Sequence, residues 1–146
     1  MRGVDGAHCT TPLEVVTLLS PRFARKRQEH LIVVSLLGGH IAGAEVVTKG
    51  LVDRTMVHPR EIFFPIIRAN ATAFLIAHNH PAGTPTPSLA DDQVTNILSD
   101  AGRLLDIPLV DHIILAGSDN HGGWKYYSYR ENARLPNVSN PGLYLY

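Results

Sequence analysis

Apolar residues along the chain gather in short continuous runs, separated by stretches in which they recur every three or four positions. Continuous apolar runs rich in β-branched side chains are typical of buried strands, whereas the wider spacing is typical of helices that cover a core. The runs predict five strands, over residues 30–37, 41–48, 71–77, 107–116 and 124–129. Gly38-Gly39 is a turn signal, so we expect the first two strands to form a hairpin.

The first helix has a clear sequence signal at its start. Thr11 can cap it, Pro12 suits the first helical position, and Glu14 stands where a capping box has its acidic residue. We expect this helix to end before Pro21, because a proline disfavours helical conformation in the residue before it.

Two further helices are expected. One covers residues 59–69, where Pro65 should kink or shorten it. The other runs from Ser88 to about Gly102, with its apolar residues at helical spacing. Strands that alternate with helices place the chain in the α/β class.

Length and composition limit what the protein can be. With 146 residues the chain suits one domain, which we expect over 11–135 after an N-terminal segment over 1–10 and before a tail over 136–146. The formal net charge of zero argues against a general DNA-coating protein. The sequence lacks an apolar run long enough to span a membrane, and its single cysteine, Cys9, fits a reducing compartment such as the cytoplasm.

A cluster of candidate metal ligands follows the third predicted strand. His78 and His80 stand two positions apart at its end, so their side chains should point the same way. On the next helix Asp91 falls at the flank of the buried face, whereas Asp92 should face solvent. Two imidazoles, one carboxylate and a water molecule make a four-coordinate catalytic zinc site.

Two interpretations without a metal stay open for the same residues. The run from His78 to Pro81 can be a polar turn, and Ser88 to Asp91 is an ordinary capping box. Cysteine-based zinc sites are excluded by the single cysteine, and the His-Glu-x-x-His motif of many metallopeptidases is absent.

The spacing His78-x-His80, seven residues, Ser88, two residues, Asp91 resembles the JAMM motif of MPN/JAB metalloprotease-like domains. The longer stretches VHPREIFFPIIRANATAFLIAHNHPAGTPTPSLAD and LVDHIILAG resemble the RadC family, long labelled as DNA repair proteins. The resemblance covers about residues 11–135, with Ala82 where the family usually has serine and an unusual Pro65. The chain is too short for the helix-hairpin-helix module of longer RadC proteins, so it resembles the stand-alone form.

The resemblance implies a fold and a set of roles. The fold would be a mixed, curved sheet flanked by helices, with the cytidine-deaminase-like architecture of JAB domains. Zinc would be held by His78, His80 and Asp91, and Ser88 would lie beside the reacting carbonyl. JAMM enzymes also carry a glutamate before their first core strand, which acts as general base.

Glu29 matches that glutamate by context, because it directly precedes the apolar run of QEHLIVVSLLG. Glu45, within the second predicted strand, and Glu61, near the start of the second helix, are the alternatives. A carboxylate at a helix start such as Glu61 is also explained by the helix dipole.

These expectations lead to a zinc-dependent peptidase or isopeptidase acting on a peptide or protein substrate. The alternative is a non-catalytic scaffold associated with DNA repair, with a structural or vestigial zinc site. DNA association should be weak and should depend on the basic residues within 22–27, while the aromatic residues within 124–129 fit packing better than base stacking. His112 is either a hydrogen-bonded core histidine or a residue that orients a metal ligand.

Overall fold

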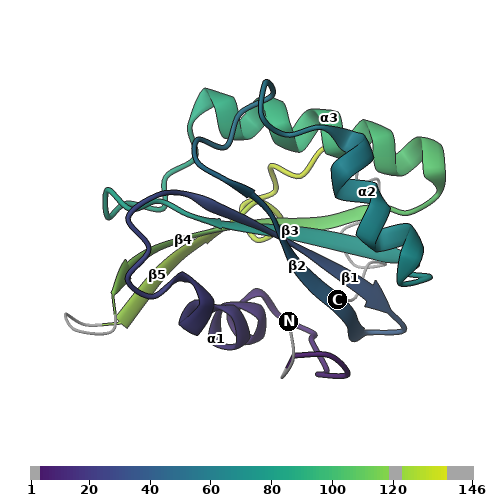
Figure 1. Ribbon diagram of the computed structural model, residues 1–146, viewed down its shortest axis with the longest axis horizontal. Helices are drawn as coiled ribbons and strands as arrows, with labels where there is room; N and C mark the ends of the chain where they lie inside the picture. Colours follow the sequence, from purple (N-terminus) through teal and green to yellow (C-terminus); the bar gives the residue numbers. More distant parts are fainter. Residues whose placement is uncertain (1–3, 119–122, 138–146) are drawn as a thin grey trace.

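The computed structural model describes residues 4–118 and 123–137, which form three layers (Figure 1). A five-stranded sheet lies in the middle, with helix α1 against one face and helices α2 and α3 against the other. This mixed, open sheet flanked by helices confirms the predicted α/β class. Most of the expected tail over 136–146, and the first three residues of the expected N-terminal segment, lie outside the described residues.

The sheet has the strand order β2-β1-β3-β4-β5. Only β3 and β4 pair in parallel among the described strands, and the connection between them contains α3. The observed bounds are β1 His30–Leu37, β2 His40–Lys49, β3 Ala73–Asn79, β4 Leu109–Ser118 and β5 Gly123–Ser128. Strand β3 therefore begins and ends two residues later than predicted, and its paired segment includes His78.

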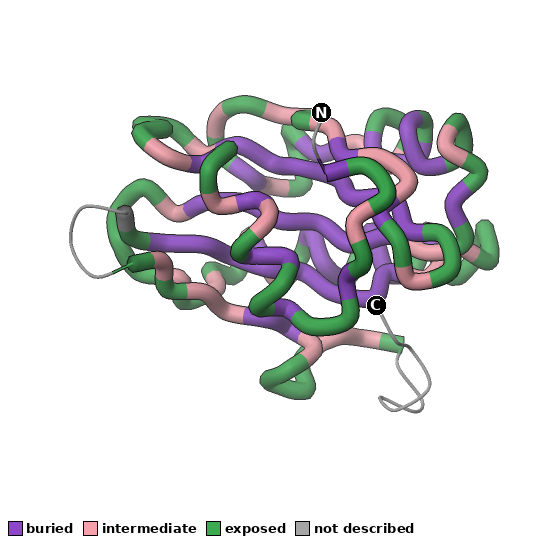
Figure 2. The backbone as a smooth tube through the Cα atoms, turned by 90° about the horizontal axis from the view of Figure 1, so that it is seen from below, coloured by how far each residue is buried: buried purple, intermediate pink, exposed green. Residues whose placement is uncertain are grey.

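Burial on both faces explains why the central strands read as continuous apolar runs rather than alternating ones. Alternate residues of β1 and β3, such as Val34 and Leu75, join α1 in one core cluster, while Val33 and Ile76 join α2 and α3 in the other. The buried backbone of these central strands stands out in Figure 2.

Helix α1 spans Pro12–Phe23 and begins as predicted, with the reciprocal hydrogen bonds of a capping box between Thr11 and Glu14. The expectation that it ends before Pro21 is wrong. The helix continues through Pro21 because Phe23 is buried in the core beside the sheet, and this burial offsets the backbone hydrogen bond that proline cannot make.

Helix α2 spans Pro59–Arg68 and is not interrupted at Pro65, which is itself buried. Helix α3 spans Leu89–Leu105, so it extends one turn beyond the predicted end and stops at Asp106 in a left-handed conformation. No helix among the described residues is long and apolar enough to cross a membrane.

Three segments of the chain meet at one edge of the fold. Strand β3 ends at Asn79, strand β1 starts beside it in antiparallel register with Leu31 opposite His78, and the loop after β3 leads into α3. Side chains from all three segments can therefore meet at this edge.

Candidate metal centre

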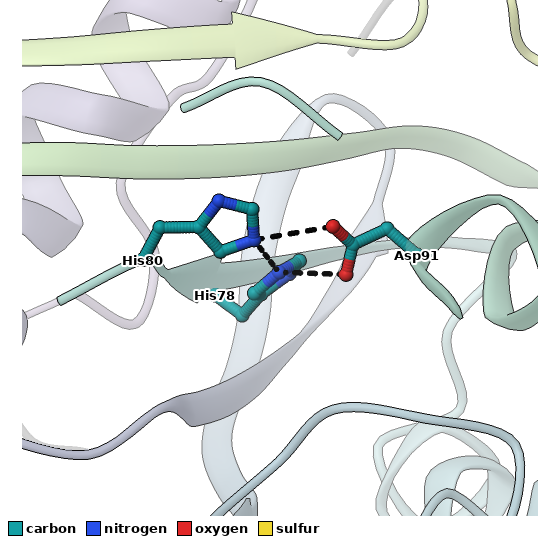
Figure 3. Close-up of side chains that lie close together, drawn as sticks. All are labelled: His78, His80 and Asp91. Carbon is teal, nitrogen blue, oxygen red and sulfur yellow. Dashed lines mark hydrogen bonds and ion pairs between the residues drawn. The ribbon is translucent and has the colours of Figure 1, made fainter. Parts of the chain in front are cut away.

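The three candidate ligands lie together at the end of β3 and the start of α3 (Figure 3). His78 lies inside β3, opposite Leu31 of β1 and Ile114 of β4. His80 follows the strand end but keeps the pairing, since its N–H donates to the Leu115 carbonyl at 2.8 Å. Asp91 lies in the first turn of α3, and one ligand atom from each of the three residues lies within 4.8 Å of the others.

Four candidate ligand atoms, two imidazole nitrogens and both carboxylate oxygens of Asp91, lie close together. His78 Nε2 lies 3.1 Å from Asp91 Oδ1, and His80 Nε2 lies 3.1 Å from Asp91 Oδ2. The two Nε2 atoms are 3.1 Å apart. His78 and Asp91 are buried, whereas the His80 side chain is 13% exposed, so a bound ion would be reached from the His80 side.

The hydrogen bond on the side of the His80 ring away from Asp91 determines which ring nitrogen carries the proton. Nδ1 lies 3.0 Å from the Thr84 carbonyl oxygen, which can only accept. Nδ1 of a neutral ring therefore carries the proton, and Nε2 presents its lone pair to Asp91.

This donor set fits a metal ion on its own chemistry. Bare imidazole nitrogens and carboxylate oxygens at about 3 Å repel one another unless a cation or a proton lies between them. Burial lowers the pKa of His80, but hydrogen bonds to Asp91 and Thr84 outweigh it and the net pKa is raised. Burial likewise raises the pKa of Asp91, but the two histidines, when protonated on the nitrogens that face it, hold it well below its ordinary value, so the pocket favours positive charge beside the carboxylate. His78, His80 and Asp91 can therefore hold a metal ion.

The capping box interpretation also holds, and it does not compete with metal binding. The Asp91 N–H donates to Ser88 Oγ at 3.1 Å, and the Ser88 N–H donates to Asp91 Oδ2 at 2.8 Å. Because the cap uses Oδ2, it holds the carboxylate with Oδ1 turned toward His78. Ser88 itself is exposed at the rim of the site.

Asp92 points away from the histidines, as predicted, but the expectation that it is solvated is wrong. Its carboxylate accepts a hydrogen bond from the Tyr129 hydroxyl at 2.8 Å and another from Arg134 at 2.6 Å. The segment after β5 folds over α3 and half-buries this side chain, a contact that helical spacing alone does not reveal.

His112 is both a buried core residue and a neighbour of a candidate ligand. Its Nε2 lies 2.8 Å from His78 Nδ1, and its Nδ1 lies 2.6 Å from the Thr95 hydroxyl. The Tyr129 ring stacks on it at 4.8 Å between centroids. Burial and the neighbouring His78 lower the pKa of His112 well below its ordinary value.

Glu29 lies just before β1, at the same edge of the sheet. Its Oε2 accepts a hydrogen bond from the Val52 N–H at 2.8 Å, and its negative charge is among the groups that raise the pKa of His80. Glu45 instead pairs with Arg68 of α2, and Glu61 is exposed in the first turn of that helix.

Asn79, which sequence reasoning missed, lies between the two histidines and faces the opposite way. Its Oδ1 accepts from the His30 N–H at 2.7 Å, and its Nδ2 donates to the Gln28 carbonyl at 3.2 Å. The only sequence signal was its place in the His-Asn-His run, where the period of a strand points it away from the candidate ligands.

The aromatic residues of β5 pack against the core or against another aromatic ring. Trp124 and Tyr126 lie against the core beneath the sheet, and Tyr127 meets Tyr129 edge to face. The basic side chains of Arg25, Lys26 and Arg27 are exposed.

Known proteins resemble this chain over most of its length. The family model described as RadC-like JAB domain matches residues 9–134. A UPF0758 protein of Chlorobium phaeovibrioides is 40% identical over 135 residues, which cover 92% of this chain and 56% of that protein. A UPF0758 protein of Chlorobaculum tepidum is 39% identical over 123 residues, which cover 84% of this chain and 53% of that protein.

The chain thus spans little more than half the length of these curated relatives. The family match covers the sheet, its helices and all three candidate ligands. On this evidence, the chain belongs to the family of RadC-like JAB domains.

Proposed function

We propose that the protein is a zinc-dependent hydrolase that cleaves an amide bond of a peptide or protein, as a peptidase or an isopeptidase. The observation that carries this proposal is the convergence of two imidazole nitrogens and a carboxylate at the rim of the sheet, with a second carboxylate, Glu29, at the same edge just before β1. Three such ligands with an open fourth position are typical of catalytic zinc sites.

His78, His80 and Asp91 would hold the ion, which when bound acidifies a water molecule and polarises a carbonyl group. Glu29 would accept the proton of the attacking water and deliver it to the leaving amine nitrogen. One Glu29 oxygen is held by the Val52 N–H, and the other has no hydrogen-bond partner among the described residues, so it is available for this transfer.

Ser88 would stabilise the carbonyl oxygen of the substrate. Its Oγ already accepts a hydrogen bond from the Asp91 N–H, which fixes the oxygen and leaves the hydroxyl proton to be donated outward. A positioned donor of this kind stabilises the negative charge that develops on the oxygen during attack.

Cleavage of a peptide library by the zinc-loaded protein tests the proposal. Asp91→Asn and Asp92→Asn form a matched pair, because both remove one charge from neighbouring residues of the same helix. We expect cleavage by the wild type and by Asp92→Asn, and no cleavage by Asp91→Asn or after treatment with a chelator. Equal cleavage by Asp91→Asn and the wild type would contradict the proposal.

The second candidate is a non-catalytic scaffold that associates with DNA. The exposed basic run ending at Arg27, two residues before Glu29, is the observation that favours it. Neutral overall charge weighs against it, because DNA affinity comes largely from neutralising phosphates.

A further inference from the structure

Thr95 lies one turn after Asp91 on α3 and bridges that residue to the sheet. Its hydroxyl lies 2.8 Å from the Asp91 main-chain carbonyl and 2.6 Å from His112 Nδ1. From His112 the contacts continue to His78, whose Nδ1 lies 2.8 Å from His112 Nε2. Thr95, His112 and His78 are all buried, with 1% or less of each residue exposed.

Only one direction of hydrogen bonding gives a proton to each of these three contacts. The Asp91 carbonyl can only accept, so the single hydroxyl proton of Thr95 goes to it. The contact between Thr95 and His112 then takes its proton from His112 Nδ1. A neutral His112 with a proton on Nδ1 accepts at Nε2, and His78 Nδ1 must supply that proton.

The consequence lies at the other nitrogen of His78. With its proton on Nδ1, the neutral ring presents a bare Nε2 lone pair, and this is the atom that faces Asp91 Oδ1 at 3.1 Å. The reverse direction would place a proton on Nε2, aimed at the carboxylate and occupying the place of a cation.

Without an ion, the reverse direction has an electrostatic advantage, because it gives the Asp91 carboxylate a hydrogen-bond donor. Thr95 opposes it, since reversal would leave the 2.8 Å contact between the hydroxyl and the Asp91 carbonyl without a proton. The series of hydrogen bonds also links α3 to β3, so it fixes the positions of the two ligands His78 and Asp91 relative to each other. Tyr129 stacks on His112 and donates a hydrogen bond to Asp92, and this contact holds the His112 ring in place.

We propose that Thr95 and His112 are positioning residues that keep His78 in the tautomer able to bind a cation. The inference rests on the proposed function only in taking His78 Nε2 as a ligand atom. Hydrogen bonds to the far nitrogen of a ligating histidine commonly change metal affinity by about 10- to 100-fold.

Thr95→Val tests the inference, with Thr95→Ser as the matched control. Valine keeps the shape and removes the hydroxyl, whereas serine keeps the hydroxyl and removes the methyl group. Long-range ¹H–¹⁵N NMR of the metal-free full chain reports which nitrogen of each ring carries the proton. We expect Nδ1–H on His78 and His112 in the wild type and in Thr95→Ser, and Nε2–H on both rings in Thr95→Val.

Zinc affinity, measured by competition with a chromophoric chelator, is the second readout. We expect Thr95→Val to bind zinc about 10- to 100-fold more weakly than the wild type, with Thr95→Ser near the wild type. A melting temperature for each variant shows that the fold is retained. Nε2–H on His78 in the wild type would overturn the inference, as would equal zinc affinity in Thr95→Val and the wild type. Neither readout uses cleavage, so the failure of the proposed hydrolysis would be a separate result.

Discussion

Asn79 holds the main chain on both sides of Glu29. Its side-chain oxygen accepts from the N–H of His30 and its side-chain nitrogen donates to the carbonyl of Gln28, so the residue between them is fixed against the end of β3. Asn79 follows His78 directly in that strand. The strand that presents a candidate ligand on one face therefore anchors the candidate base through its other face.

Removing this anchor should destabilise the fold. We expect Asn79→Ala to lower the free energy of unfolding by about 1–3 kcal/mol, because it leaves the buried His30 N–H without its acceptor. Denaturant unfolding measures the change. Asn96→Ala, an exposed asparagine on α3, is the control and should stay within about 0.5 kcal/mol of the wild type. Equal stability of the two variants would show that the anchor contributes nothing.

Glu29→Gln should preserve the fold and the zinc content while slowing hydrolysis by about 10²- to 10⁴-fold. Glutamine keeps the shape of the side chain and cannot accept the proton of the attacking water. Glu45→Gln is the comparison. The Glu45 carboxylate forms an ion pair with Arg68, so this substitution should leave the rate nearly unchanged. Assays on any substrate found in the library would decide between them, and loss of activity in Glu45→Gln alone would reject Glu29 as the base.

Patterns along the chain predicted the elements well because burial on both faces of β1, β3 and β4 leaves continuous apolar runs. Helical spacing likewise separated Asp91, which faces the histidines, from Asp92, which does not. Errors arose where distant segments meet. The end of α1 depends on the burial of Phe23, and the environment of Asp92 depends on Tyr129, 37 residues away.

The supporting residues of the site were harder to find for the same reason. Thr95 and Asn79 are ordinary polar residues within a helix and a strand, and their partners lie 17 and 49 residues away. Spacing rules act over one or two turns, so they identify the candidate ligands but not the hydrogen bonds that orient them.

Cys9 should be unreactive in the folded protein. Burial, assisted by the negative charge of Glu14, raises the pKa of its thiol from 9.0 to about 12. Thiolates rather than thiols react with iodoacetamide, so labelling at about pH 8 should require a denaturant. Rapid labelling of the native protein would contradict this burial.

The same shift predicts a pH dependence of stability. Because the folded-state pKa is raised, the contribution of Cys9 is fully present below about pH 9 and is lost as the pH rises toward 12. The free energy of unfolding of the wild type should fall over this range more than that of Cys9→Ala. Parallel pH profiles for the two proteins would count against the raised pKa.

DNA binding should be weak and should disappear near physiological salt. Four phosphate contacts give a log–log salt slope of at most about −3.6 on duplex DNA. Titrations at two salt concentrations should compare the wild type with a variant carrying alanine at the four basic positions Arg22, Arg25, Lys26 and Arg27. Submicromolar binding at physiological salt that survives the quadruple change would favour the scaffold alternative.

Metal analysis of the purified protein tests the central claim most directly. Elemental analysis should find about one zinc ion per chain in the wild type, as expected for three protein ligands with an open fourth position. His80→Ala removes one of the two imidazoles and should abolish stoichiometric zinc binding. Asp92→Asn should retain the zinc, because the Asp92 carboxylate accepts hydrogen bonds from Tyr129 and Arg134 and does not face the histidines. Full zinc content in His80→Ala, or a wild type that binds no zinc, would contradict the account.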